Sequence, residues 1–173
     1  MRRTIECVGM SVTKKIIIII SISVIVASSI IIPLTINHRQ SNLPVDLSSA
    51  SKTVRIDDRM YTLEVYLWRD FMPGVEPNGT HLLVVLNIIA EGDIAFPANI
   101  DAEKMWVING EEIWNATLEN VISFTASNIL RKRADGGPKW GPGIKVDVIV
   151  ELFSSSGDKY YLLAKDQYIN ITW

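Results

Sequence analysis

The sequence predicts an all-β domain that follows one N-terminal transmembrane helix. Two observations lead to this prediction: an uncharged, isoleucine-rich run near the N-terminus, and apolar residues that recur at every second position in several runs after residue 53. A period of two is the signature of a strand with one buried face. Beyond residue 53 no segment has a sustained helical period.

The isoleucine-rich run predicts a transmembrane helix over residues 16–36. No side chain from Ile16 to Asn37 is charged, and ten isoleucines stand between Ile16 and Ile32. Each isoleucine contributes roughly −0.3 to −0.6 kcal/mol to membrane insertion, and about 20 apolar residues cross a bilayer as a helix. The expected partner of this segment is membrane lipid.

Charge on either side of the run predicts its orientation. Residues 1–15 have four basic side chains and one acidic side chain, a net charge of +3, which leaves −5 for residues 16–173. The positive-inside rule then places residues 1–15 in the cytoplasm as a basic tail. The expected localisation is the cell membrane, with a single pass and an extracytoplasmic C-terminal domain.

A cleaved signal peptide is the alternative to this anchor. Residues 16–26 have the length of an apolar signal region, and Ala27, Ser28 and Ser29 supply small residues for cleavage. Three isoleucines continue past that point, at residues 30–32, which favours an uncleaved signal anchor.

Residues 37–52 are polar, rich in serine and interrupted by Pro44, which predicts a flexible stalk. A flexible chain of this length spans on the order of 20 Å. Residues 53–173 form the predicted extracytoplasmic domain, and their number is sufficient for one hydrophobic core.

The strands of that domain are predicted from alternation and from turn residues. Residues 61–68 alternate apolar and polar side chains, residues 82–90 are almost continuously apolar, as in a central strand, and residues 144–153 alternate again. Asn109-Gly110 predicts a hairpin, residues 101–104 one helical turn at most, and residues 118–130 one or two strands. The expected strands are residues 53–56, 61–68, 82–90, 105–108, 111–114, 144–153, 159–163 and 168–173.

Short strands separated by loops at this spacing predict an antiparallel, immunoglobulin-like β-sandwich. The single cysteine, Cys7, precedes the apolar run, so the domain has no disulfide. The sandwich must therefore be stable without the inter-sheet bridge of antibody domains.

No catalytic motif is present. The sequence has no G-x-S-x-G, no H-E-x-x-H and no cysteine after the apolar run. His38 and His81 have no spaced partner for a zinc site. One loop region has acidic residues of the kind that bind calcium, at Glu91, Asp93, Asp101 and Glu103, but it lacks the twelve-residue EF-hand pattern. We therefore expect no metal and no cofactor. The acidic balance of the domain argues against nucleic acid as a partner.

Two turn-rich segments are the candidate contact loops. One is the end of a predicted strand at Trp68, Arg69 and Asp70, where a structural ion pair that caps the sandwich is the alternative interpretation. The other surrounds Lys139 and Trp140, between glycines and prolines. A basic cluster around this second loop is either an anion or lipid-headgroup site or a solvated loop or edge strand, and its members are Arg131, Lys132, Arg133 and Lys139.

Three N-x-S/T sequons, at Asn78, Asn115 and Asn170, are candidate glycosylation sites. Their number exceeds slightly what chance would give and agrees with export. Coincidence is the alternative.

Three runs carry a resemblance: LWRDFMPG at residues 67–74, FPANIDAEKMWVING at 96–110 and GPKWGPGIKVDVIVEL at 137–152. They resemble a small group of exported, single-domain prokaryotic proteins to which no activity is assigned. The resemblance implies one intact domain over most of residues 61–173, and it implies no cofactor and no catalytic residue.

The sequence as a whole predicts a non-catalytic binding or interaction module with an unknown protein or glycan partner. One alternative is a carbohydrate-binding or cell-envelope structural domain that uses exposed tryptophans. Another is a secreted hydrolase.

Overall fold

The computed structural model describes residues 45–121 and 126–173, all of which belong to one compact unit, Gln40–Trp173. The predicted tail at residues 1–15 and the predicted transmembrane helix at residues 16–36 lie outside the described residues. In the part that the structure describes, no helix is both long and apolar enough to cross a membrane.

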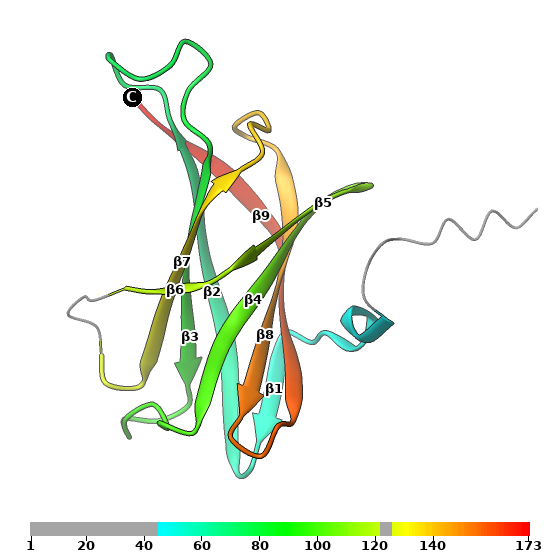
Figure 1. The fold of residues 1–173 in the computed structure, drawn as a ribbon. Coiled ribbons are helices and arrows are strands. Elements are labelled where there is room, and N and C mark those ends of the chain that lie inside the picture. The colour runs from blue at the N-terminus through cyan, green and yellow to red at the C-terminus, as the bar shows by residue number, and fades with distance from the viewer. Residues whose placement is uncertain (1–44, 122–125) are drawn as a thin grey trace, which may run out of the picture. The chain divides into compact units, whose positions relative to one another are not determined.

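The described residues form nine strands and one short 3-10 helix (Figure 1), which confirms the all-β class. The helix is η1 (Val45–Ser49). The strands are β1 (Thr53–Ile56), β2 (Arg59–Asp70), β3 (Leu82–Ala90), β4 (Ile100–Asn109), β5 (Glu112–Thr117), β6 (Glu119–Asn120), β7 (Ile129–Gly137), β8 (Lys145–Ser154) and β9 (Lys159–Thr172).

The strands form one sheet that curls almost into a barrel. Its order is β5-β4-β8-β9-β2-β3-β7-β6, with β1 paired to β2. The long strand β9 (Figure 1, red) pairs first with β8 and then, in parallel, with β2, so it joins two facing layers. At the other side the chain passes from β5 to β6 through Leu118 alone, which links the two outer edges.

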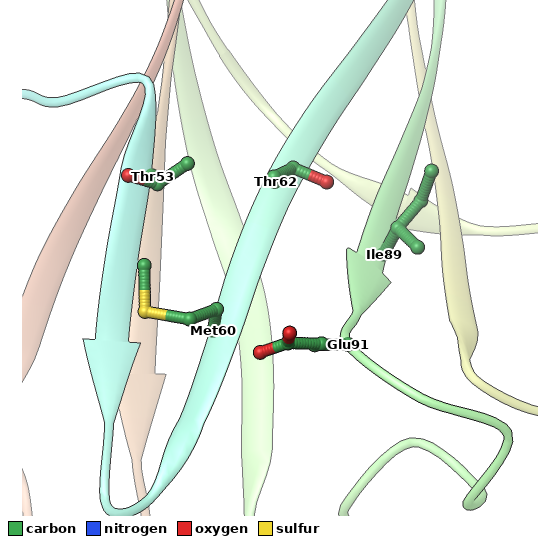
Figure 2. A pocket seen from close by; sticks show the side chains of 5 residues that line it. All are labelled: Thr53, Met60, Thr62, Ile89 and Glu91. Carbon is green, nitrogen blue, oxygen red and sulfur yellow. The ribbon is translucent and has the colours of Figure 1, made fainter.

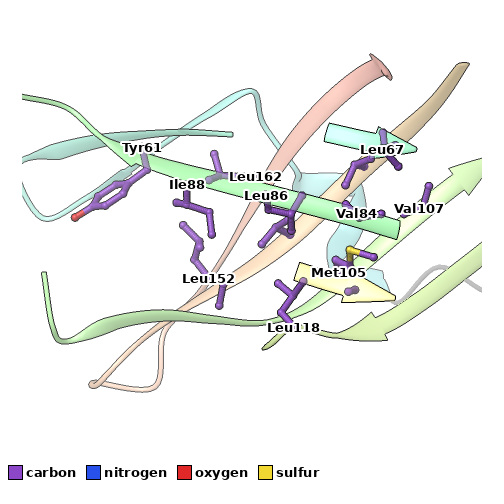
Figure 3. Packing of buried hydrophobic residues seen from close by; sticks show 14 of the residues in the cluster. Tyr61, Leu67, Val84, Leu86, Ile88, Met105, Val107, Leu118, Leu152 and Leu162 are labelled. Atoms are coloured by element: carbon purple, nitrogen blue, oxygen red, sulfur yellow. The ribbon is translucent and has the colours of Figure 1, made fainter. Parts of the chain in front are cut away.

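The core lies between the two layers because inward side chains of both are apolar. Val84, Leu86 and Ile88 of β3 are fully buried and face Met105 and Val107 of β4 across the core (Figure 3). Full burial of such a side chain contributes about 1.5–3 kcal/mol.

Helix η1 packs on the outer side of β4, β8 and β9, where a flexible stalk was expected through residue 52. Leu47 is buried against Trp106, Ile149 and Tyr161. Ser51 then bonds through its backbone to Tyr161 and Leu163 of β9. Residues 45–52 are therefore folded onto the domain, because the outer side of these strands is apolar and Leu47 shields it.

One ion pair joins the two layers. Lys132 of β7 lies opposite Leu86, so its side chain points into the core between the two layers, where it is 3% exposed. Its Nζ lies 2.6 Å from Oδ1 of Asp101 on β4, whose side chain is 44% exposed. The Lys132 ammonium therefore depends on the ion pair more than the Asp101 carboxylate does, because the carboxylate is also in contact with water.

We predict that the two ends of this pair differ in their effect on stability. Asp101→Ala leaves a buried ammonium without this carboxylate and should cost about 3 kcal/mol, whereas Lys132→Met keeps the apolar stem and should cost less than about 1.5 kcal/mol. Urea unfolding of both variants measures the difference. Equal losses would show that the ammonium is not the dependent partner.

Candidate functional site

The two predicted contact loops meet at one end of the domain. Residues 71–81 connect β2 to β3, and residues 138–144 connect β7 to β8; both lie at the upper end in Figure 1. Neither segment contains a helix or a strand. Their backbone groups must therefore be bound by other parts of the chain or by water.

Arg69, at the end of β2, binds both loops. Its side chain is buried, with 3% of the residue exposed. Nε donates to the carbonyl of Thr80 at 2.8 Å, and Nη1 donates to the carbonyls of Trp140 at 2.8 Å and Lys139 at 3.1 Å. Nη2 donates to the carbonyl of Asn78. One guanidinium group therefore holds four carbonyls from two loops, the geometry for which a planar fork of donors is suited.

These partners differ from the ion pair considered from the sequence. Among the described residues, the hydrogen bonds of the Arg69 side chain all go to backbone carbonyls. The Asp70 carboxylate instead accepts from the backbone N–H of Met72 at 2.8 Å. The partners of Arg69 are therefore backbone carbonyls rather than a carboxylate.

An aromatic ring and a glycine complete the packing around the guanidinium. Cζ of Arg69 lies 4.8 Å from the centre of the Phe71 ring, a cation–π contact. Gly79 has φ +70°, and a Cβ there would lie 2.8 Å from the Phe71 ring and 2.9 Å from the carbonyl oxygen of Asp70. A larger residue at position 79 would therefore displace the ring from Arg69.

Side chains fix the second loop as well. Lys139 forms an ion pair with Glu76 of the first loop, and the Nε1–H of Trp140 donates to the carboxylate of Glu112 on β5. The hydrogen bond and charge of Lys139 lower the pKa of Glu76. Trp140 is half-buried and packs against the edge of the core, so its ring is only partly available for a ligand.

Trp68 is on the other side of β2. Side chains alternate along a strand, so Trp68 points away from the core while Arg69 points toward the loops. It lies opposite Leu83 of β3 and Asn170 of β9. The structure therefore brings Arg69, Lys139 and Trp140 together and leaves Trp68 on the outer face.

An open hollow of about 410 Å³ lies beside the guanidinium, between the loops. Its lining supplies apolar rings, one amide and two cationic groups that already have partners. Six residues from the end of β2 and from the two loops form this lining. They are Arg69, Phe71, Pro77, Asn78, Lys139 and Pro142.

A second hollow, of about 370 Å³, crosses the outer side of β1, β2 and β3. Figure 2 shows Thr53, Met60, Thr62, Ile89 and Glu91 around it. Glu91 is the one ionisable residue in this lining. In the described ranges no group of three or more His, Cys, Asp or Glu residues is placed to hold a metal ion.

The basic cluster near the second loop is divided between two sides of β7. Lys132 points inward to Asp101. Its neighbours point outward, where Nε of Arg131 donates to Asn87 at 2.8 Å and Arg133 pairs with Glu119 at 3.1 Å. The fourth member, Lys139, pairs with Glu76, so the four charges do not converge on one anion site.

The three sequon asparagines are exposed and lie on different parts of the surface. Asn78 lies in the first loop, Asn115 on the outward side of β5 and Asn170 on the outward side of β9. The sequence did not predict the carbonyls that Arg69 binds or the position of the Phe71 ring beside it. The glycine and prolines around them were the available signal.

No protein-family model and no curated protein matches the chain. Among solved structures, the X-ray structure of Northeast Structural Genomics Consortium target SoR45 is similar, with 11% identity and a TM-score of 0.38. The match covers 64% of this chain and 86% of that chain. It assigns neither a fold family nor an activity to this protein.

We predict that Arg69→Lys destabilises the domain by about 3 kcal/mol, because an ammonium cannot reach four carbonyls at once and leaves some of them unpaired. Amide hydrogen exchange should rise in residues 78–80 and 138–143 before it rises in the strands. The matched control is Arg133→Lys on the exposed β7 surface, where a change of less than about 0.5 kcal/mol is expected. Similar losses in both variants would contradict the role of Arg69.

The Glu76–Lys139 pair predicts an acid-dependent link between the loops. Because the folded protein has a lowered Glu76 pKa, the pair stabilises the folded state above the ordinary glutamate pKa and is lost as pH falls through the lowered value. A carboxyl titration by NMR should show the Glu76 pKa rising toward its ordinary value in Lys139→Met and staying low in Lys139→Arg. An unchanged pKa in Lys139→Met would rule out the pair.

Proposed function

We propose that this chain is a single-pass membrane protein that presents a non-catalytic binding domain outside the cell. Residues 16–36 would span the membrane with residues 1–15 in the cytoplasm. The uncharged isoleucine-rich run and the basic flank that precedes it support this orientation.

The domain is proposed to be immunoglobulin-like, and the order of its strands supports this. One layer runs β2-β3-β7-β6 and the other runs β5-β4-β8-β9. We letter β2 to β9 in chain order as A, B, C, C′, D, E, F and G. The two layers then read A-B-E-D and C′-C-F-G, as they do in immunoglobulin domains. The lack of cysteine in residues 53–173 distinguishes it from antibody domains.

The proposed contact surface is the end at which residues 71–81 and 138–144 meet. The observation that supports it is the buried Arg69, which bonds to carbonyls of both loops and so holds them in one arrangement. Loops held by a rigid sandwich are where binding residues concentrate, and pre-ordered loops lose little entropy when a partner binds. The open hollow and the exposed Met72 lie in this region.

The partner is proposed to be a protein or a glycan. The hollow presents proline and aromatic surface with one amide, which suits a contact of mixed apolar and polar character. The cationic groups beside it already have partners, so a strongly anionic ligand is less suited to it.

A photo-crosslinking amino acid at position 72 tests this surface in intact cells. Met72 is 48% exposed in the proposed contact end, and Ile94, which is 75% exposed in the loop between β3 and β4 at the opposite end, is the matched control. We predict a discrete adduct from position 72 and none from position 94. Equal adducts, or none from position 72, would contradict the proposed surface.

A further inference from the structure

The outer face of β2 and β9 carries an aromatic patch. Tyr66 of β2 is 50% exposed and Tyr168 of β9 is 54% exposed. Trp68 is half-buried on the same side of β2 as Tyr66, because the two are separated by one residue. Lys145 lies 5.2 Å from the centre of the Tyr168 ring and occupies part of its surface. The Tyr66 hydroxyl donates to Glu64 at 3.4 Å.

Asn170 lies within this patch. The parallel register of β2 and β9 places Asn170 opposite Trp68. Tyr168 precedes Asn170 by two residues, so both point outward from β9. Nδ2 of Asn170 donates to the carbonyls of Leu67 at 3.2 Å and Tyr168 at 3.4 Å, which orients the amide along the junction of the two strands.

The other two sequons lack an exposed aromatic patch of this kind. Asn115 lies opposite Trp106, but that ring is 8% exposed and packs against Tyr161 at 6.3 Å. Asn78 lies beside the half-buried Phe71, and its carbonyl is bound by Arg69. Asn170 is therefore the sequon that stands beside several accessible rings.

We propose that Asn170 carries an N-linked glycan whose first sugar rings lie on Tyr66, Trp68 and Tyr168. The proposal rests on the extracytoplasmic location proposed above. Aromatic faces bind apolar surface and also attract weakly polarised hydrogens, and the C–H faces of a sugar ring supply both. A glycan fixed at Asn170 brings those faces to the patch without the entropic cost of a second molecule.

The modification is a group transfer from a lipid-linked oligosaccharide phosphate. The bond from the anomeric carbon to the phosphate oxygen breaks, and a bond from that carbon to Nδ2 of Asn170 forms. The displaced lipid phosphate leaves with the bonding electrons, and the proton lost from Nδ2 passes to solvent. One N–H remains on Nδ2, enough to keep one of its two hydrogen bonds to the strand carbonyls.

The test uses the full chain expressed in eukaryotic cells with an N-glycosylating secretory pathway. Peptide mass spectrometry measures the occupancy of Asn78, Asn115 and Asn170, and Asn115→Gln and Asn170→Gln are matched variants. Thermal unfolding is measured before and after enzymatic removal of the glycans. We expect Asn170 to be occupied, and its glycan to raise the Tm by about 4 °C, an effect of the size that a single favourable contact produces in a domain of this length.

Two further variants test the stacking. Tyr66→Thr and Trp68→Thr keep residues that favour strands, and each is compared with its own deglycosylated form, so that a general loss of stability cancels. The increase in Tm due to the Asn170 glycan should fall by at least half in each. The same increase in the variants and the parent would overturn the contact between sugar and aromatic rings.

The possible results test the Asn170 glycan and the proposed extracytoplasmic location separately. Occupied Asn78 or Asn115 with an empty Asn170 overturns the proposal alone, whereas three empty sequons in the full chain contradict the location too. The unglycosylated chain is also examined for dimerisation and for binding of soluble cell-wall oligosaccharides. If either depends on Trp68, the patch belongs to a second copy or to a foreign glycan and the proposal fails.

Discussion

The arrangement of the candidate site depends on one buried cation. Arg69 extends from the end of β2 to four backbone carbonyls, in segments that lie about ten and about seventy residues further along the chain. A buried charge is costly unless it is well hydrogen-bonded, and unpaired buried carbonyls are costly as well. Each therefore stabilises the other, and two loops without secondary structure adopt one conformation.

This constraint connects the fold to the proposed function. In the curled sheet, β2 is held between β9 and β3, and this pairing fixes the position of its end. Through its hydrogen bonds, Arg69 holds residues 78–80 and 139–140 in fixed positions relative to β2. The proposed interaction surface can then be formed by loops that are less flexible than loops usually are.

Many of the strands could be predicted from the sequence, because alternating apolar and polar side chains indicate a strand with one buried face. Strands β1 and β3 match the predicted residues, and the hairpin near Asn109-Gly110 forms, although Gly110 and Glu111 are its turn residues. Only Gly110 has a positive φ there, which corresponds to a turn with glycine at its first central position.

Irregular pairing explains where the strand prediction failed. Residues 101–104 were expected to form at most one helical turn, yet they belong to β4, because a register shift between Ala102 and Lys104 moves the inward positions from even to odd numbers. The two strands predicted within residues 159–173 are one strand, β9, with a bulge at Asp166, where φ is +57°. A period of two cannot be followed through such shifts.

The site was predictable in location but not in geometry. Composition identified both loops, since glycine and proline mark turns. That Arg69 points toward the loops while Trp68 points outward follows from alternation, but the bonds to Trp140 and Lys139 depend on tertiary structure across about seventy residues. No local pattern reports such a contact.

The most direct test of the central claim is the exchange rate of the Arg69 side-chain Nε–H, measured by NMR near neutral pH. Because this proton is buried and donates to the carbonyl of Thr80, we predict slow exchange with solvent and hindered rotation of the guanidinium. Arg55, whose side chain is 64% exposed, provides the comparison. Exchange of Arg69 as fast as that of Arg55 would contradict the claim that this residue holds the two loops together.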